Sequence, residues 1–296
     1  MHRSPGGYMH RVGDEKREMS PDFLARLFQQ RRQARIIRFD EQPVPNAVLG
    51  DLNEALWLRF ATQRTRDSRD GLLRKLGMAN LNEEVLRPSV AGVLLASDDP
   101  RQWLPNAFIQ AVAYRGTDIR PAGEQAYQLD AADITGPLDQ QVLYACHFVS
   151  KNMRVAASKK MGREDTLQFD MTAVFEAIVN AVAHRDYAMQ DAKIRLRIFA
   201  DRLELYSPGA IPNTMTVDSL PYRQAARNEA ITSLLAKCRV PDTEGLGVGR
   251  STMMDKRGEG VSIILHNSEQ LSGRAPEYSL VDGSELRLVI YAPDGN

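Results

Sequence analysis

Hydrophobic residues recur at helical spacing in the middle of the chain, most clearly between residues 175 and 187. Four of them stand at i, i+3, i+4 and i+7, the pattern of one face of an α-helix: Phe175, Ile178, Val179 and Val182. Asp170 stands where an N-cap is expected. The pattern therefore predicts an amphipathic helix that begins near residue 170.

The polar side of this helix carries an unusual set of residues. Glu176, Asn180 and His184 are spaced by four, so their side chains project from one stripe. Asn disfavours a helix interior because its amide competes for backbone hydrogen bonds. The stripe suggests a site that needs carboxylate, amide and imidazole together. The alternative is the solvated face of an ordinary amphipathic helix, and the helix alone favours that alternative.

The spacing of hydrophobic and polar residues also predicts the other elements of a main domain that starts near residue 85. Residues 89–96 form a buried strand or a short helix, and periodicity does not decide between them. Alternation after the central helix predicts a hairpin formed by residues 193–199 and 203–206. The remaining expectations are a strand at 107–114, a helix at 138–152, helices after Asn228 and through Met253, and strands at 261–265 and 285–291.

The residues before this domain predict small elements. We expect a strand at 8–12, a helix from Ser20, a helix opened by a capping box of Asp51 and Glu54, and a short helix at 72–76. A local basic cluster consists of Arg26, Arg31, Arg32, Arg35 and Arg38. It is either a solvated surface or a phosphate-contacting patch, and the solvated surface is the simpler interpretation.

Composition narrows the class of protein. The 296 residues include 38 basic and 38 acidic ones, so no overall basic excess indicates nucleic-acid binding. Cys146 and Cys238 are far apart and form no CxxC pair, which argues against a zinc site or a disulfide framework. Without an apolar run of 18 residues or an apolar signal core, we expect a cytoplasmic protein and no membrane partner.

Glycines supply a second candidate feature. Gly209 ends the predicted hairpin, where its freedom permits a close approach to a ligand. Gly245, Gly247 and Gly249 alternate before a predicted helix and could present N–H groups to phosphate. The chain contains no GxxxxGK[ST] phosphate loop, which argues against a P-loop helicase motor.

Four motifs in order carry a family resemblance: residues 176–187, Ser207-Pro208-Gly209, Arg227-Asn228 and residues 245–249. Together they resemble the C-terminal domain of the RecG-related transcriptional regulators, which is similar to the GHKL, or Bergerat-fold, ATP-binding domains. The resemblance covers residues 85–296. It implies an α+β fold, a GHKL-like α/β sandwich whose mixed sheet carries helices on one face.

The N-terminal part carries a second resemblance. Residues 1–45 resemble the end of the Schlafen AlbA-type domain that precedes the ATPase-like domain in this family, and residues 46–84 are expected to be a helical connector. The family's DNA-binding role lies in the AlbA-type part, whose front half is missing here. We therefore expect a fragment of a longer protein, DNA contacts through the AlbA-type part, and a homodimer.

The resemblance also implies roles for single residues. Asn180 would place its amide oxygen on Mg²⁺, a hard ion that prefers oxygen ligands, and Glu176 would orient or deprotonate water if ATP is hydrolysed. Gly245, Gly247 and Gly249 would form a lid on the phosphates, and Gly209 is a further cofactor-binding candidate. His184 and Arg185 are included among these candidates, with a structural pair to Asp186 as the alternative.

One departure from the superfamily leaves two hypotheses open. The Asp of the DxGxG motif, which reads adenine, is replaced by the segment Ser207-Pro208-Gly209-Ala210. The first hypothesis is a Mg-ATP-binding regulatory domain, with weak ATPase activity at most, that controls an attached DNA-binding part. The second is a non-catalytic dimerisation or scaffold domain with a degenerate nucleotide pocket. Glu176 and Asn180 favour the first hypothesis, and the lost Asp favours the second.

Overall fold

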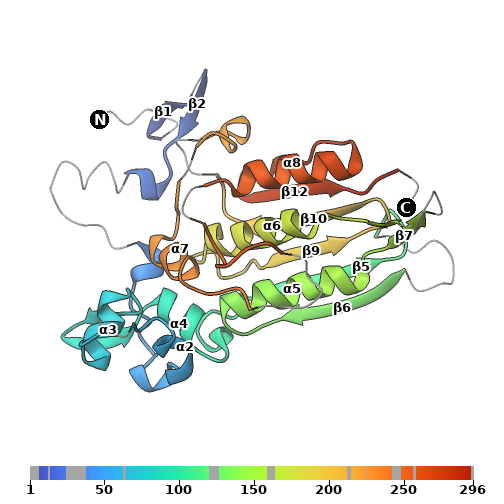
Figure 1. The fold of residues 1–296 in the computed structure, drawn as a ribbon. Helices are drawn as coiled ribbons and strands as arrows, with labels where there is room; N and C mark the ends of the chain where they lie inside the picture. Colours follow the sequence, from blue (N-terminus) through green and yellow to red (C-terminus); the bar gives the residue numbers. More distant parts are fainter. Residues whose placement is uncertain are drawn as a thin grey trace.

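A six-stranded mixed sheet forms the centre of the structure, a computed structural model (Figure 1). The strand order is β11-β12-β10-β9-β5-β6, and within it β5 pairs with β9 in parallel while the other neighbours are antiparallel. The strands are β5 (Ile109–Tyr114), β6 (Gln128–Ile134), β9 (Ile194–Ile198), β10 (Arg202–Pro208), β11 (Glu277–Val281) and β12 (Glu285–Tyr291). The structure describes residues 7–12, 14–24, 38–62, 65–119, 127–158, 164–211, 215–223, 225–241, 248–255 and 258–294.

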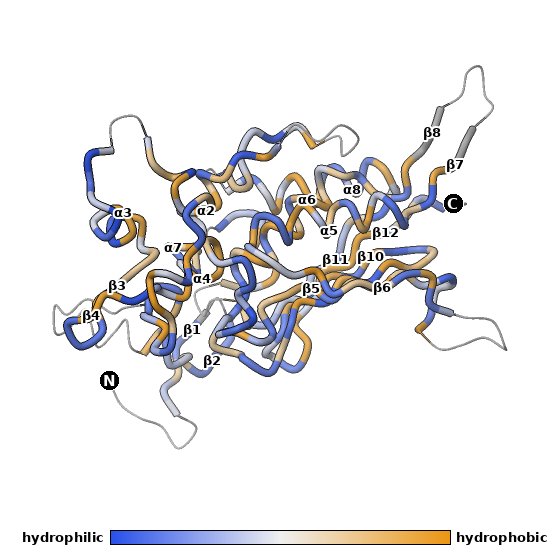
Figure 2. The backbone as a smooth tube through the Cα atoms, turned by 90° about the horizontal axis from the view of Figure 1, so that it is seen from below, coloured by the Kyte–Doolittle hydropathy of each residue, from blue (hydrophilic) through white to orange (hydrophobic). Residues whose placement is uncertain are grey.

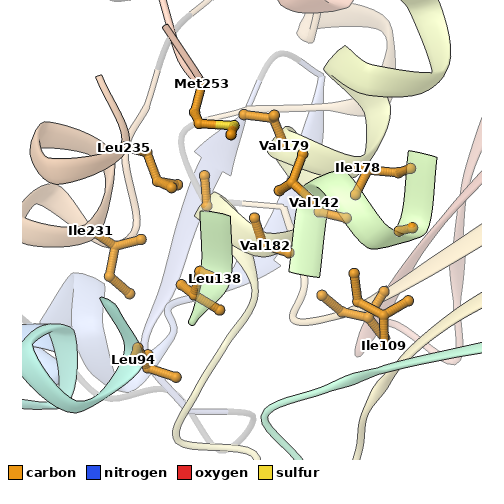
Figure 3. Packing of buried hydrophobic residues seen from close by; sticks show 14 of the residues in the cluster. Leu94, Ile109, Leu138, Val142, Ile178, Val179, Val182, Ile231, Leu235 and Met253 are labelled. Atoms are coloured by element: carbon orange, nitrogen blue, oxygen red, sulfur yellow. The ribbon is translucent and has the colours of Figure 1, made fainter. Parts of the chain in front are cut away.

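Three helices cover one face of this sheet, as Figures 1 and 2 both show: α5 (Leu138–Asn152), α6 (Met171–His184) and α8 (Gly260–Ser272). The central helix α6 buries the predicted apolar face. Its Ile178, Val179 and Val182 pack in one cluster with Val142 of α5 and Ile109 of β5 (Figure 3). The predicted α+β sandwich with helices on one face of a mixed sheet is therefore confirmed.

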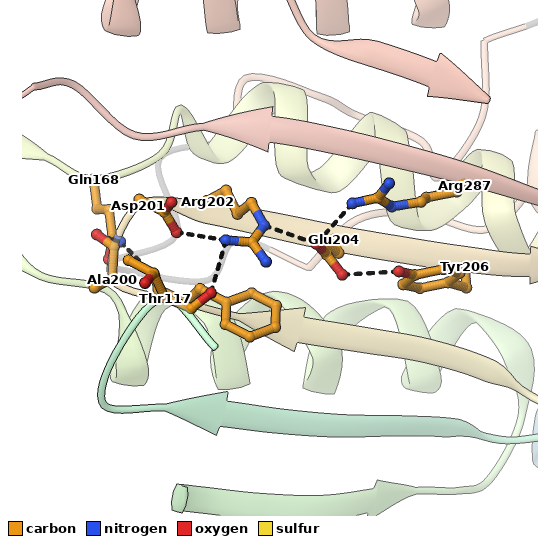
Figure 4. A network of polar contacts seen from close by, with 9 residues as sticks. Thr117, Gln168, Ala200, Asp201, Arg202, Glu204, Tyr206 and Arg287 are labelled. Carbon is orange, nitrogen blue, oxygen red and sulfur yellow. Dashed lines mark hydrogen bonds and ion pairs between the residues drawn. The ribbon is translucent and has the colours of Figure 1, made fainter. Parts of the chain in front are cut away.

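The face of the sheet away from the helices is polar. Along β10, Leu203 and Leu205 face the core and alternate with Arg202, Glu204 and Tyr206, of which Glu204 is itself buried beneath its partners at 3% exposed. Glu204 accepts hydrogen bonds from Arg202 at 2.7 Å and from Tyr206 at 2.8 Å, and Arg287 of β12 also binds it at 2.8 Å (Figure 4). Alternation of this kind lets one side of a strand meet the core while the other meets solvent.

Short elements gather at one end of the sandwich (Figures 1 and 2). They are α2 (Glu54–Leu58), α3 (Arg69–Lys75), α4 (Val90–Ala96), α7 (Glu229–Leu235), the hairpin β3 (Ala79–Asn82)–β4 (Val85–Pro88), and the 3₁₀ turns η1 (Phe39–Glu41), η2 (Leu49–Asp51) and η3 (Pro100–Gln102). Trp57 of α2 and Leu73 of α3 belong to the same hydrophobic cluster as α5 and α6. The segment predicted as a connector thus contributes to the main core.

The remaining elements are two hairpins and one 3₁₀ turn: β1 (Met9–Val12)–β2 (Glu15–Glu18), β7 (Val155–Ser158)–β8 (Glu164–Leu167) and η4 (Val217–Ser219). The predicted strand at 8–12 corresponds to β1. Of the helix predicted from Ser20, residues 21–24 are helical, and residues 25–37 lie outside the described residues. The predicted cluster of arginines falls there too, except for Arg38.

Several element predictions are confirmed and three are wrong. α5 spans the predicted residues 138–152, the hairpin β9–β10 follows α6, and residues 89–96 form helix α4 with Ser89 as its N-cap. Residues 261–265, predicted as a strand, lie in helix α8. The residues around Met253 form no helix but a bridge between Arg239 and Thr252. The N-cap of α2 is Asn53, whose side chain accepts from the Ala55 N–H at 3.0 Å, whereas Asp51 belongs to η2.

Candidate functional site

A cavity of about 470 Å³ lies between α6, the end of β10, α7 and the start of α8. This volume is within the range of small-molecule sites. Glu176, Asn180 and His184 all line the cavity, so the polar stripe of α6 faces a hollow and not bulk solvent. Much of the remaining lining is apolar, from the sheet and the loop after β10: Leu205, Ile211, Met215, Leu220, Leu286 and Leu288.

Helix α6 presents its stripe in a fixed direction because both of its ends are tied. At its start, the predicted N-cap is confirmed, since the Asp170 side chain accepts from the Ala173 N–H at 2.8 Å. At its end, the Asn228 amide donates to the carbonyls of Ala183 at 3.0 Å and Arg185 at 2.8 Å. These bonds satisfy carbonyl groups that a helix end leaves without helical partners.

Asn180 lies at the middle of the stripe and is half-buried. Within the described residues, no hydrogen bond engages its amide. A buried helix normally carries such an amide only where a partner is available. Asn180 is therefore placed to offer an oxygen and an N–H₂ group to a molecule in the cavity.

Glu176 is enclosed and paired. The residue as a whole is 5% exposed, and Arg250 donates from Nε to Oε1 at 2.5 Å. Burial raises the pKa of the Glu176 carboxyl, and the charge of Arg250 offsets part of that effect. The pair brings a cationic residue from the segment at 248–255 against α6, 74 positions away in the chain.

The N-terminus of α8 meets the stripe at Glu176 and Asn180. A Cβ atom at Gly260 would lie 2.8 Å from Oε2 of Glu176 and 3.2 Å from Nδ2 of Asn180, so a larger residue here would push against the ends of both side chains. The N-cap residue, Glu259, makes no side-chain cap. The first N–H groups of this 13-residue helix therefore have no helical partner and carry the positive end of its dipole toward the cavity.

Gly209 and Arg227 build the opposite end of the cavity. Gly209 has φ +118°, and a Cβ there would lie 2.9 Å from the Cβ of Asp186. Arg227 donates to Asp186 at 2.9 Å and to the carbonyl of Ala210. The predicted pair between Asp186 and His184 or Arg185 is thus wrong, because Arg227 occupies Asp186.

His184 lies at this end with a neutral ring at physiological pH. Burial lowers the pKa of His184 to about 4, and the charge of Arg227 acts in the same direction. No hydrogen bond joins its ring nitrogens to the described residues around it. A neutral imidazole carries one N–H donor and one nitrogen acceptor, and both are available here.

The other predicted site residues differ in position. Arg185 is 2% exposed, donates to the Ala192 carbonyl at 2.6 Å, stacks 4.7 Å from the Tyr187 ring and does not line the cavity. Gly209 does line it. Gly249 is exposed and lies outside the lining, and Gly245 and Gly247 lie outside the described residues.

Two features of the site were missed at the sequence level: Arg250, and the glycines Gly258 and Gly260, which line the cavity. The segment Gly258-Glu259-Gly260 directly precedes the apolar run 261–265. Glycines just before a helix are a signal for a phosphate-binding N-terminus. The apolar run 261–265 is typical of a strand, so the sequence pattern does not show that Gly258 and Gly260 precede a helix.

Two kinds of feature are absent from the described residues. No group of three or more His, Cys, Asp or Glu side chains is placed to hold a metal ion among them. None of their helices combines the length and the hydropathy that crossing a bilayer requires.

The fold and the cavity define an α+β sandwich with a partly open site, polar and apolar in lining, between the central helix, the sheet, α7 and α8. Residues 191–290 match the family described as "Putative ATP-dependent DNA helicase recG C-terminal". The match supports a RecG-related, ATPase-like domain over these residues and agrees with the predicted resemblance there. The matched segment contains β9 to β12, α7 and α8, and helix α6 with its stripe precedes it.

Among solved structures, the DIP2311 protein from Corynebacterium diphtheriae is similar to this chain, with a TM-score of 0.61 and 23% identity. The similarity covers 96% of this chain and 53% of that one, so the chain spans about half the length of its structural neighbour. At this identity the comparison establishes the fold alone. No curated protein matches the chain.

Proposed function

We propose that the cavity binds ATP together with Mg²⁺, and that its occupancy regulates an attached DNA-binding part. One observation carries the proposal: the unengaged amide of Asn180 and the uncapped N-terminus of α8 converge at one end of the cavity. A helix N-terminus attracts phosphate through its free N–H groups and its dipole. The segment's match to an ATPase-like family supports the same ligand class.

The cavity lining has a polar end, at α6 and the α8 N-terminus, and an apolar wall from β10 and β12, a division that suits the phosphates and the base of a nucleotide. The phosphates would meet the α8 N-terminus, at the end of the cavity where Glu176 and Asn180 lie. The base would lie over the apolar residues of β10 and β12. Mg²⁺ usually takes few protein ligands and completes its shell with phosphate oxygens and water, so Asn180 suffices as a protein contact without an acidic cluster.

The proposal concerns binding and regulation. In this structure Arg250 occupies one oxygen of Glu176, so Glu176 is a general base for water only after that ion pair opens. Weak hydrolysis is compatible with this arrangement, and the regulatory role does not need it.

The N-terminal segment supplies a route for regulation. Asp40 of η1 accepts hydrogen bonds from the N–H groups of Ala230 at 2.8 Å and Ile231 at 3.2 Å, at the start of α7. Arg38 pairs with Glu229 at 2.7 Å. Glu229 and Thr232 of α7 also line the cavity. A ligand that shifts α7 would therefore act on the segment that resembles the end of an AlbA-type domain. DNA contacts and a homodimer belong to this proposal through the same resemblance.

Isothermal titration with Mg-ATP tests the binding step. The wild-type chain is expected to bind, and Asn180→Ala is expected to weaken binding at least tenfold because it removes the metal-contacting oxygen. Asn152→Ala is a matched control, since Asn152 ends α5 and does not line the cavity. Absence of heat with the wild type would overturn the proposal and favour the scaffold, for which the replaced DxGxG carboxylate is the supporting observation.

A further inference from the structure

Three residues of the loop that replaces the DxGxG motif, Ser207, Pro208 and Gly209, make hydrogen bonds within the fold. The Ser207 hydroxyl donates to the Ala181 carbonyl at 3.0 Å. Pro208 has no N–H, and its carbonyl accepts from the Asp186 N–H at 2.7 Å. The Gly209 N–H donates to the Ser284 carbonyl at 2.8 Å. These groups tie the loop to the end of α6 and to the turn before β12, so none of the three is directed at a ligand.

The carboxylates around the cavity are also engaged, each in an ion pair with an arginine. Glu176 pairs with Arg250, and Asp255 lies 3.7 Å from the same guanidinium. Glu229 pairs with Arg38. Asp186, behind Gly209, is bound by Arg227 and by the Ala188 N–H at 3.1 Å. Within the described part of the chain, the three carboxylates that line the cavity, Glu176, Glu229 and Asp255, thus each have a cationic partner.

His184 is the group that remains free at this end. It stands eight residues beyond Glu176 on α6, which corresponds to about 12 Å along a helix axis. The α8 N-terminus marks the phosphate end at Glu176 and Asn180, so His184 lies where the far end of an extended nucleotide would fall. The apolar lining beside it, including Ile211 and Leu205, suits the faces of a ring.

We propose that His184 contacts the polar edge of a purine base and takes the place of the missing carboxylate. This inference rests on the proposed function and adds the residue that reads the base. A carboxylate only accepts hydrogen bonds, which favours the amino group of adenine. A neutral imidazole accepts from that amino group or donates to the O6 of guanine. The site therefore discriminates weakly between the two purines.

The test compares Mg-ATP, Mg-GTP and Mg-tripolyphosphate by isothermal titration on the wild type, His184→Ala and His184→Gln. The wild type is expected to bind both nucleotides with affinities within about tenfold of each other. His184→Ala is expected to weaken both nucleotides about tenfold, the effect of one lost hydrogen bond, and to leave tripolyphosphate affinity unchanged. His184→Gln, which keeps a donor and an acceptor, is expected to restore most of the loss.

His147→Ala is the matched control, because His147 is exposed on α5 away from the cavity. Unchanged nucleotide affinity in His184→Ala would overturn the base-reading role and leave the proposed function intact. An equal loss of tripolyphosphate affinity would also overturn it, since the residue would then act on the phosphates or the fold. If neither the nucleotides nor tripolyphosphate bind the wild type, the proposed function fails and this inference fails with it.

Discussion

The ion pair between Glu176 and Arg250 sets the electrostatics of the cavity wall. The two side chains are 7% and 19% exposed, so neither charge is fully hydrated. A buried charge that loses its partner pays the full desolvation penalty, whereas removal of both charges is far less costly.

Arg250→Ala is therefore expected to lower the free energy of unfolding by about 2 kcal/mol at pH 7. Adding Glu176→Gln should recover most of the loss, because the orphaned charge is then gone. Urea unfolding of the two single variants and the double variant forms a double-mutant cycle that measures the coupling. Simple additivity of the two losses would contradict the pair seen here.

The residues of the site differ in how far the sequence foretells them. Glu176, Asn180 and His184 share one helix, so spacing alone places them on one stripe. Arg250 lies 74 positions from Glu176 in the chain, and no local pattern encodes that contact. Arg185 follows His184 in sequence, but it lies beyond the last residue of α6 and its side chain donates to the Ala192 carbonyl instead of facing the cavity.

Among the elements, α4 shows how tightly the short helices are packed. A Cβ at Gly92 would lie 2.0 Å from the backbone carbonyl oxygen of Met78, a group that cannot rotate away. Gly92→Ala is therefore expected to destabilise the fold by about 3 kcal/mol, as overpacking against a rigid neighbour does. Gly50→Ala, with no atom within 4 Å of the new Cβ, should stay within about 0.5 kcal/mol of the wild type in thermal unfolding. Equal stability of the two variants would show that α4 is not packed in this way.

The predictable elements are those with a long period or a clear alternation. Helices α5 and α6 and the hairpin β9–β10 fall into this group, because 14 or 15 residues of helical spacing, or two alternating runs, leave little ambiguity. The run 261–265 is too short to distinguish a strand from a helix. Its context decides the outcome, since the helix continues to Ser272 and ends at Gly273 in the left-handed conformation, φ +71°.

At the scale of the whole molecule, helix α7 contacts the N-terminal segment on one side and lines the cavity on the other. Asp40 is fully buried beneath the start of α7, and α7 forms one wall of the cavity. Sequence patterns did not reveal this link, because Asp40 and Ala230 are 190 positions apart.

The contact between Asp40 and α7 can be measured through the pH dependence of stability. Burial raises the pKa of Asp40 from 3.8 to about 6, although the N–H groups of Ile231 and Ala230 oppose the change. The folded state therefore holds the proton more tightly than the unfolded chain does. The stability that this contributes is complete below pH 3.8 and is lost as the pH rises through 6. Asp40→Asn keeps an acceptor but does not titrate, so the stability of the wild type relative to this variant should fall by roughly 2 kcal/mol between pH 4 and pH 7. Urea unfolding of both proteins across this range measures the difference, in which the other titrating groups cancel. A difference that stays constant with pH would mean that Asp40 is hydrated and does not anchor α7 from a buried position.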